Sequence, residues 1–228
     1  MRAARKSVEY VITLCLFRAM HKGPSSQQTI DGRKANAEST QAALRGAGRR
    51  LFGALGFEKT ALGTLCAEAG VTTGALYHHF GDKKGLFAAV AEELDATLVR
   101  VVQAAMAQAA QAGATPWDAF LAGMDAFLAA AQDPQARRIG LTDAPAVLGT
   151  QGWLEIRERQ GLGAMVHTVE GLQAAGAMPS GDARLRARLI LGLLYGALEA
   201  LDHDSRPWNQ ALPDARVLLH AMLAGLRG

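Results

Sequence analysis

The stretch AGVTTGALYHHFGDKKGLF, residues 69–87, decides the fold of this sequence. Gly70 separates two short segments whose apolar residues recur at helical spacing, and a tight turn between helices needs a backbone conformation that glycine adopts easily. Thr72 can cap the helix that runs to Phe80, and Asp82 can cap the helix after it. The stretch therefore predicts two short helices joined by a tight turn and followed at once by a longer helix.

The residues before this stretch predict a further helix packed ahead of the pair. Apolar side chains recur at helical spacing from Ala37, and the pattern ends at Gly56. Thr60 can cap the next helix, which Gly70 ends. We therefore expect a helix-turn-helix domain over residues 37–84. Its small shared core is expected to contain Phe52, Leu65, Val71, Leu76 and Phe80.

The remainder of the chain, residues 85–228, predicts a larger helical domain. A long helix from Asp82 to about Gln111 is followed by helices at about 116–132, 151–175, 182–202 and 214–227. The region around Pro134 and Pro145 is expected to be irregular, and Pro213 is expected to lie between helices. No alternation of apolar and polar residues is long enough for a strand, so the predicted fold class is all-α.

Charge is distributed unevenly along a chain whose net charge is +3. Residues 33–84 carry eight Lys or Arg and four acidic residues, whereas residues 85–228 carry eleven and fifteen. A basic front on an acidic body favours a polyanionic partner. The two cysteines, Cys15 and Cys66, are far apart and form no paired motif, which is typical of a protein in a reducing cytoplasm.

Residues 1–36 are predicted to be a disordered extension. The apolar run from Val8 to Phe17 follows basic residues, as in a signal peptide, but Glu9 interrupts it and no cleavage site of small residues follows. We expect a cytoplasmic protein that does not bind membranes, with an exported or membrane-attached protein as the alternative. No segment is long and apolar enough to predict a membrane span.

The stretch at residues 69–87 resembles the signature of the TetR family of bacterial regulators, which reads A-G-V-S/T, then L-Y-x-H-F, then K and L. The resemblance also takes in Leu51-Phe52 and Gly56-Phe57 and covers about residues 37–90. It implies a transcriptional regulator, most often a repressor, whose partner is double-stranded operator DNA. Ala61 and Gly63 depart from the family pattern, which puts contacts from their helix in doubt.

The resemblance also assigns contacts with DNA. The residues that open the recognition helix, Thr73 to Ala75, are small enough to approach base edges in the major groove. Tyr77 and His78 are expected at phosphates, and His79 at a phosphate or against the next turn. Lys83 is expected to bind a phosphate at the start of the following helix. The full set of expected DNA-binding residues is Thr60, Thr72, Thr73, Gly74, Ala75, Tyr77, His78, His79 and Lys83.

The last two long helices predict a dimer interface. Residues 182–202 and 214–227 are apolar on two faces, so each helix needs a neighbour on both sides. Gly192, Gly196 and Ala200 recur every four residues and allow another helix to approach closely. We expect a four-helix bundle between two subunits, as the resemblance also implies, and a homodimer that matches a pseudo-palindromic operator.

The resemblance implies a ligand cavity between the long helix and this bundle. The expected inducer is an unidentified, small and largely apolar molecule that tilts the long helix and changes the spacing of the recognition helices. A loop at residues 143–147, with Arg157 and Arg159, is a candidate for the cavity mouth. Candidate lining residues are Trp117, Phe120, Met124, Phe127, Trp153, His167 and Tyr195.

The sequence contains none of the motifs of common enzyme classes. There is no nucleophile elbow, no zinc-protease helix and no phosphate-binding loop, so no catalytic residue, cofactor or metal is predicted. His167 and His203 are isolated histidines rather than a metal site. The alternative function is a helical small-molecule-binding protein with weak or lost DNA binding. Substitutions of Tyr77 and Lys83 discriminate the two, because only a DNA-binding protein would lose affinity for DNA.

Overall fold

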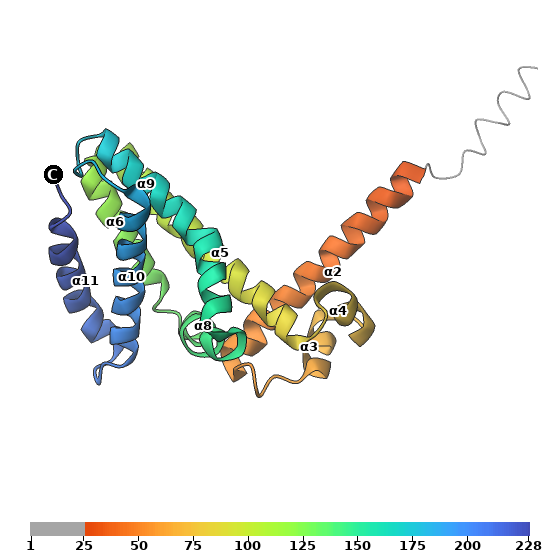
Figure 1. Ribbon diagram of the computed structural model, residues 1–228. Helices are drawn as coiled ribbons and strands as arrows, with labels where there is room; N and C mark the ends of the chain where they lie inside the picture. The colour runs from red at the N-terminus through yellow and green to blue at the C-terminus, as the bar shows by residue number, and fades with distance from the viewer. Residues whose placement is uncertain (1–25) are drawn as a thin grey trace, which may run out of the picture. The chain divides into compact units, whose positions relative to one another are not determined.

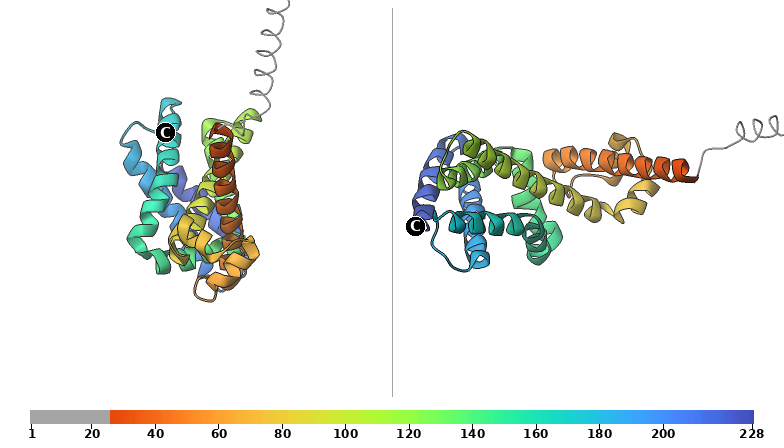
Figure 2. Two further views of the ribbon diagram at one scale, coloured as in Figure 1. Left: turned by 90° about the vertical axis from the view of Figure 1, so that its right-hand side faces the viewer. Right: turned by 90° about the horizontal axis from the view of Figure 1, so that it is seen from above.

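The computed structural model describes the backbone of residues 26–228 and the side chains from residue 34 onward. Every element among residues 26–228 is helical and no strand occurs there (Figures 1 and 2), which confirms the all-α prediction. The apolar run predicted to begin at Val8 lies outside the described residues. The helices are α2 (Ser26–Leu55), α3 (Leu62–Ala69), α4 (Thr73–Phe80), α5 (Lys83–Gln111), α6 (Pro116–Ala130), α7 (Pro134–Arg137), the π-helix η1 (Arg138–Asp143), α8 (Ala144–Arg157), the π-helix η2 (Glu158–Leu162), α9 (Gly163–Ala174), α10 (Ala183–Asp202) and α11 (Trp208–Ala224).

The chain divides into two units, residues 1–42 and 43–228. The first contains the beginning of α2, which starts at Ser26. This helix overlaps the last part of the extension predicted over residues 1–36, and the boundary at residue 36 stays a prediction. The nearest proline is Pro24, and residues 26–55 contain none, so no proline interrupts the hydrogen bonds of α2. The predicted boundary at residue 84 stays a prediction.

Helices α3, α4 and the C-terminal part of α2 form the predicted helix-turn-helix. Gly56 and Gly70 end their helices at φ angles of 85° and 65°, which favour glycine. The side chain of Thr72 accepts a hydrogen bond from the Ala75 amide, and Asp82 caps α5 by accepting from the Gly85 amide. Both predicted caps are confirmed. In the core Phe52, Leu65 and Leu76 are fully buried, and Val71 and Phe80 pack against them.

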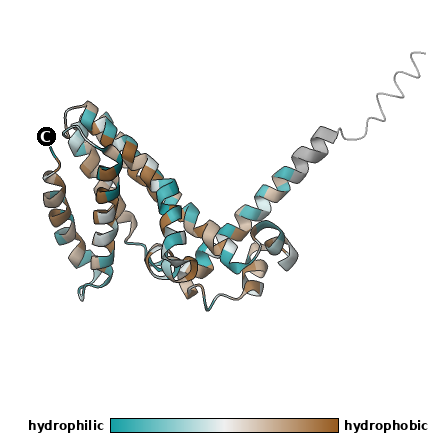
Figure 3. Ribbon diagram, in the orientation of Figure 1, coloured by the Kyte–Doolittle hydropathy of each residue, from teal (hydrophilic) through white to brown (hydrophobic). Residues whose placement is uncertain are grey.

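The body is built around α5, which packs along α6 (Figure 1), while α9, α10 and α11 complete a second core. Phe120, Met124 and Val169 are among its fully buried residues. Helix α11 is hydrophobic over much of its length (Figure 3), although only its inner face is buried. This arrangement leaves apolar residues of α10 and α11 on the surface.

Two expectations about prolines are wrong. The region around Pro134 and Pro145 is helical, with both prolines in the first turn of their helices, α7 and α8, where a proline removes no helical hydrogen bond. The residues at 143–147 are therefore helical rather than a loop, although Gly149 interrupts α8 with a φ of 78°. Pro213 lies inside α11, at an exposed position in the second turn.

Candidate DNA-binding surface and ligand cavity

The recognition helix α4 presents one polar, solvent-exposed face. Leu76 anchors the helix in the core, whereas Thr73, Gly74 and His78 are exposed and the Tyr77 side chain is 53% exposed. The first turn of α4 therefore has small, exposed side chains, so its backbone could approach the floor of a major groove closely. Thr72 is also exposed, but its hydroxyl accepts the capping bond at 3.3 Å from the Ala75 amide. Ala75 is half-buried, and so is His79, whose ring lies 4.9 Å from the ring of His78.

Two residues expected to bind phosphates, Thr60 and Lys83, make internal hydrogen bonds in this structure. Thr60 is buried and does not cap α3, whose N-cap is Ala61 without a side-chain bond. The Thr60 hydroxyl instead donates to the Gly56 carbonyl at 2.7 Å. The Lys83 ammonium donates to the carbonyls of Phe57 and Thr60 at 3.0 and 3.2 Å and lies 4.2 Å from the centre of the Phe57 ring. Both side chains therefore fasten the α2–α3 loop, because its carbonyls turn inward and need donors.

Gly85 has a structural role that the sequence did not reveal. A Cβ atom at this position would lie 1.9 Å from the Phe80 carbonyl oxygen, so the first turn of α5 passes directly under the end of α4. Only glycine permits this approach. The residue thus fixes the angle between the recognition helix and the long helix that leads into the body.

The body contains a cavity of about 160 Å³ between α5, α6, α8 and α10. Its wall is mainly apolar, with Leu94, Leu98 and Leu141 among the lining residues. Of the predicted lining residues, Trp153 and Tyr195 face this cavity, and Met124, Phe127 and Tyr195 line a smaller neighbouring one of about 40 Å³.

Three other predicted lining residues do not take part. Trp117 and Phe120 are buried in the core of α6 and line neither cavity. His167 lies exposed on α9 and lines neither cavity. The helical pattern of the sequence identified apolar and aromatic positions but not which of them border empty space.

One wall of the cavity holds a buried carboxylate that the sequence analysis missed. Asp95 is 4% exposed, and its Oδ1 accepts a hydrogen bond at 3.2 Å from the Tyr195 hydroxyl. Burial raises the pKa of Asp95 to about 6, while the Tyr195 hydrogen bond and the charge of Arg157 oppose that rise. Burial likewise raises the pKa of Tyr195. Asp95 shares the apolar face of α5 with Ala91 and Leu98, which was the available signal.

A half-buried cation, Arg157, lies on the same wall. The Arg157 guanidinium lies 3.7 Å from the centre of the Tyr195 ring and 4.8 Å from that of Trp153. Burial lowers the pKa of Arg157. Three buried side-chain atoms on this wall have no hydrogen-bond partner among the described residues: Arg157 Nε, Trp153 Nε1 and Asp95 Oδ2. The cavity therefore combines an apolar interior with one acceptor and two donors.

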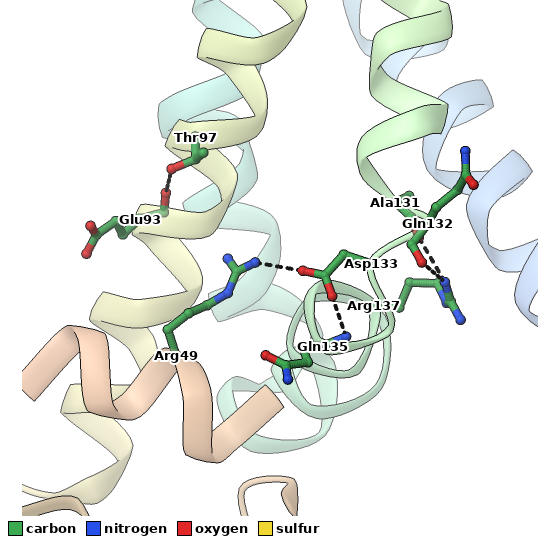
Figure 4. A network of polar contacts seen from close by, with 8 residues as sticks. All are labelled: Arg49, Glu93, Thr97, Ala131, Gln132, Asp133, Gln135 and Arg137. Carbon is green, nitrogen blue, oxygen red and sulfur yellow. Dashed lines mark hydrogen bonds and ion pairs between the residues drawn. The ribbon is translucent and has the colours of Figure 1, made fainter. Parts of the chain in front are cut away.

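A second network joins the cavity wall to the helix-turn-helix. Arg49 of α2 and Asp133 form an ion pair at 3.0 Å, and Asp133 also accepts from the Gln135 amide (Figure 4). Arg49 and Asp133 both line the cavity. Beyond them, Arg138 donates to the Ala54 carbonyl at 2.6 Å and Asp143 accepts from the Phe57 amide at 2.8 Å.

Gly53 allows this contact to be close. A Cβ atom there would lie 2.6 Å from Cβ of Gln135 in α7. The segment α7–η1 thus lines the cavity with Ala136 and Gly140 while its other side holds the end of α2 and the α2–α3 loop.

The outer faces of α10 and α11 are apolar and exposed. Leu189 on α10 and Leu218 on α11 are 65% and 60% exposed. A Cβ atom on Gly192 or Gly196 would meet nothing within 4 Å. A surface with small residues next to exposed large apolar ones is typical of a helix-packing interface.

Neither a metal site nor a membrane span is found in the part of the chain that the structure describes. No three His, Cys, Asp or Glu side chains there are grouped so that they could hold a metal ion. Among residues 26–228, no helix has both the length and the apolar composition needed to cross a bilayer.

Comparisons with known proteins agree with this geometry. Residues 44–90 match the model of bacterial regulatory proteins of the tetR family, and residues 117–226 match the tetracyclin repressor-like C-terminal domain. The chain is 44% identical over 64 residues to the HTH-type transcriptional repressor AcnR of Corynebacterium glutamicum and 41% identical over 59 residues to the regulator AcrR of Shigella flexneri. These matches span 28% and 26% of this chain and only 34% and 27% of those proteins.

A solved structure matches nearly the whole chain. A TetR-family transcriptional regulator from Pectobacterium atrosepticum is 34% identical, with a TM-score of 0.72 over 85% of this chain and 96% of that one. The helix-turn-helix, the helical body and both family models therefore point to one conclusion: the chain belongs to the TetR family of bacterial regulatory proteins.

Proposed function

We propose that the protein is a cytoplasmic, ligand-responsive transcriptional repressor that binds a pseudo-palindromic operator as a homodimer and leaves it when a small, largely apolar molecule enters the body. One observation carries the proposal: the segment α7–η1 borders the cavity and also holds the helix-turn-helix. A ligand that moves this segment must move the DNA-binding helices with it, because packed helices shift as units.

The DNA contacts are proposed from the exposed face of α4. Thr73 and Gly74 face base edges, Ala75 lies beside them, and Tyr77 and His78 bind phosphates. Lys84 takes the phosphate role first expected of Lys83, because its side chain is exposed at the same helix start. His79, half-buried beside His78, is proposed to brace this surface.

The proposed partner for the exposed face of α10 and α11 is a second copy of the chain. Leu189, Leu218 and Met222 are each more than half exposed, which is costly for a monomer in water. Two recognition helices must stand about 34–36 Å apart to enter successive major grooves, and a two-fold dimer supplies that pairing. Gly192 and Gly196 leave room for the partner helix.

Release is proposed to act through geometry. Helix α5 has 29 residues and so spans about 44 Å at 1.5 Å per residue, from the turn under α4 to the body. Movement of α7–η1 by a bound ligand and tilt of α5 both change the spacing of the two recognition helices. To lower DNA occupancy strongly, the ligand must favour the DNA-incompetent state by a few kcal/mol.

The proposal is tested with a labelled DNA fragment from upstream of the protein's own gene. Fluorescence anisotropy is expected to give saturable binding that Tyr77→Phe and His78→Ala weaken, because each variant loses a hydrogen bond to a phosphate. The matched control is Glu170→Gln, a charge change on the exposed face of α9 in the body. Failure of the protein to bind this fragment more tightly than unrelated DNA would favour a ligand-binding protein without a role at DNA.

The dimer is tested by sedimentation of the full chain. Leu189→Asp is expected to give monomer or aggregate, because it buries a charge in the interface. Leu185→Ala, a milder change on the same exposed side of α10, is expected to leave the dimer in place. A wild-type monomer at micromolar concentration contradicts the dimer.

A further inference from the structure

The cavity carries hydrogen-bonding atoms that the protein leaves without partners. Asp95 Oδ2, Trp153 Nε1 and Arg157 Nε are the buried side-chain atoms of this kind in the part of the chain that the structure describes, and all three residues line the same cavity. A buried polar atom without a partner destabilises the fold, and more so if it is charged. Because each of these atoms has less than 1 Å² of accessible surface, a bound molecule supplies the missing bonds only when the side chains around it shift.

The charges around the cavity favour a neutral molecule. The carboxylate of Asp95 and the guanidinium of Arg157 lie on one wall and balance each other. Arg49 and Arg137, which also line the cavity, are paired with Asp133 and Asp202. A cation or an anion in this apolar space would add a charge without a partner, and desolvation makes that unfavourable. Arg157 already covers one face of the Trp153 ring and one face of the Tyr195 ring, where a cation could otherwise bind.

The volume of the cavity is sufficient for about one ring. Its volume is about 160 Å³, and an engineered apolar cavity of about 150 Å³ holds benzene. The lining contributed by Leu94, Leu98, Val101 and Leu141 is apolar, so it gives water few partners away from the polar wall. A molecule with an apolar ring and a polar end fits both parts.

We propose that the cavity binds a compact, neutral, hydroxylated ring compound of the phenol or cyclic-alcohol class. Once the side chains that cover these atoms move aside, its hydroxyl donates to Asp95 Oδ2, and its oxygen accepts from Trp153 Nε1 or Arg157 Nε. A hydroxyl suits this wall because one group both donates and accepts. The inference rests on the proposed function in that it names the ligand class for the same cavity.

The test compares ligands of nearly equal size that differ in the polar group. The full-chain protein is titrated by calorimetry with 4-ethylphenol, 4-ethyltoluene, 4-ethylbenzoate and 4-ethylbenzylamine at neutral pH. The phenol is expected to bind at least tenfold more tightly than the toluene, which fills the same space but leaves the three polar atoms unpaired. The charged compounds are expected to bind more weakly than the phenol. Equal binding of the phenol and the toluene, or tightest binding of a charged compound, overturns the proposal.

Two variants locate the binding. Trp153→Phe keeps the ring beneath Arg157 but removes the indole N–H, and Asp95→Ala removes the acceptor. Each is expected to reduce the ratio of phenol to toluene affinity at least threefold. Trp117→Phe, the same change at a buried tryptophan outside both cavities, is expected to leave the ratio unchanged. If Asp95→Ala does not fold, Trp153→Phe decides alone, and an unchanged ratio in that variant contradicts the assignment.

DNA release is measured separately, so that the two proposals fail in different ways. The phenol is added to the complex of protein and upstream DNA, and its affinity is also measured with DNA bound. Tight, selective binding without any effect on DNA supports the ligand class and contradicts the proposed function. Release by other compounds, with no preference for the phenol, supports the function and contradicts the ligand class.

Discussion

The helix-turn-helix and the cavity treat their buried polar groups in opposite ways. In the helix-turn-helix, the hydroxyl of Thr60 and the ammonium of Lys83 bond to carbonyls of the same loop. In the cavity, Asp95, Trp153 and Arg157 keep atoms without partners. The first region is complete by itself, so its geometry is fixed before DNA arrives. The second is incomplete, so it can respond to a molecule that completes it.

The largest expected effect comes from breaking the fixed geometry at Gly85. Gly85→Ala places a Cβ against the Phe80 carbonyl and is expected to cost about 3 kcal/mol or more, since backbone atoms cannot yield as side chains can. For a chain of this length each kcal/mol lowers the melting temperature by roughly 2–4 °C. Gly63→Ala is the control, because its Cβ meets nothing within 4 Å. A melting temperature for Gly85→Ala equal to that of the control would show that the α4–α5 corner is not rigid.

The next effect concerns the incomplete region and is a dependence on pH. Because the folded-state pKa of Asp95 is raised from 3.8 to about 6, the carboxylate destabilises the fold once it ionises. Stability from this group is fully present below about pH 4, falls as pH rises to about 6, and then stays level. The total loss is about 2–3 kcal/mol at 1.36 kcal/mol per pKa unit. The groups that face Asp95 are Tyr195, Arg157 and Glu92.

Urea unfolding of the wild type and of Asp95→Asn from pH 4.5 to 7.5 measures this. As pH rises, the free energy of unfolding of the wild type is expected to fall relative to that of Asp95→Asn by up to about 2–3 kcal/mol. The reason is that asparagine does not ionise. Glu170→Gln, at an exposed position of α9, controls for the loss of one charge. A difference that is constant with pH would mean that Asp95 is better solvated than its burial indicates.

A smaller effect separates adjacent lysines. Lys83→Met removes two bonds to the carbonyls of Phe57 and Thr60 and is expected to lower stability by about 1–2 kcal/mol. Lys84→Met is expected to leave stability within about 0.5 kcal/mol, because the side chain is exposed. It should instead weaken DNA binding and reduce the salt slope by about 1. Thermal unfolding measures stability, and anisotropy at several salt concentrations measures DNA affinity. If Lys83→Met weakened DNA binding and Lys84→Met lowered stability, the phosphate contact would belong to Lys83, as first expected.

The smallest effect is on sequence preference. Thr73→Ala is expected to relax the preference at one base pair by about 1 kcal/mol, since a single hydroxyl contact is weaker than a bidentate pair. The measurement is competition between the operator and variants with one altered base pair. A uniform loss of affinity for all these DNA molecules would mean that Thr73 contacts a phosphate instead.

The sequence predicted the helix-turn-helix well because its determinants are local. Gly70, Thr72 and Asp82 act on their own turns, and the spacing of apolar residues marks the buried faces. The cap prediction failed where the same side chain had a second possible partner nearby. Thr60 has the chemistry of a helix cap, but the inward carbonyl of Gly56 offers its hydroxyl an internal partner.

The cavity could not be predicted in the same way. Asp95 and Tyr195 are 100 positions apart, and only the folding of the whole body brings α5 and α10 near enough for this bond. The pairing of Arg49 with Asp133 likewise joins residues 84 positions apart. The empty volume arises where side chains from several helices do not fill the space between them. The spacing of apolar residues along the sequence does not show where this happens. An acidic residue on the apolar face of α5 was the one available sign.

The wall shared by the two cavities has a consequence for how such a regulator changes over generations. Asp95, Leu98 and Tyr195 line both the larger and the smaller space, so the hydrogen bond from Tyr195 to Asp95 acts as a partition between them. None of these residues belongs to the surface of α4. A single substitution in the partition can therefore enlarge the range of accepted molecules while the recognised DNA sequence stays the same. Selection can act on the chemical signal and on the target gene separately, within one chain.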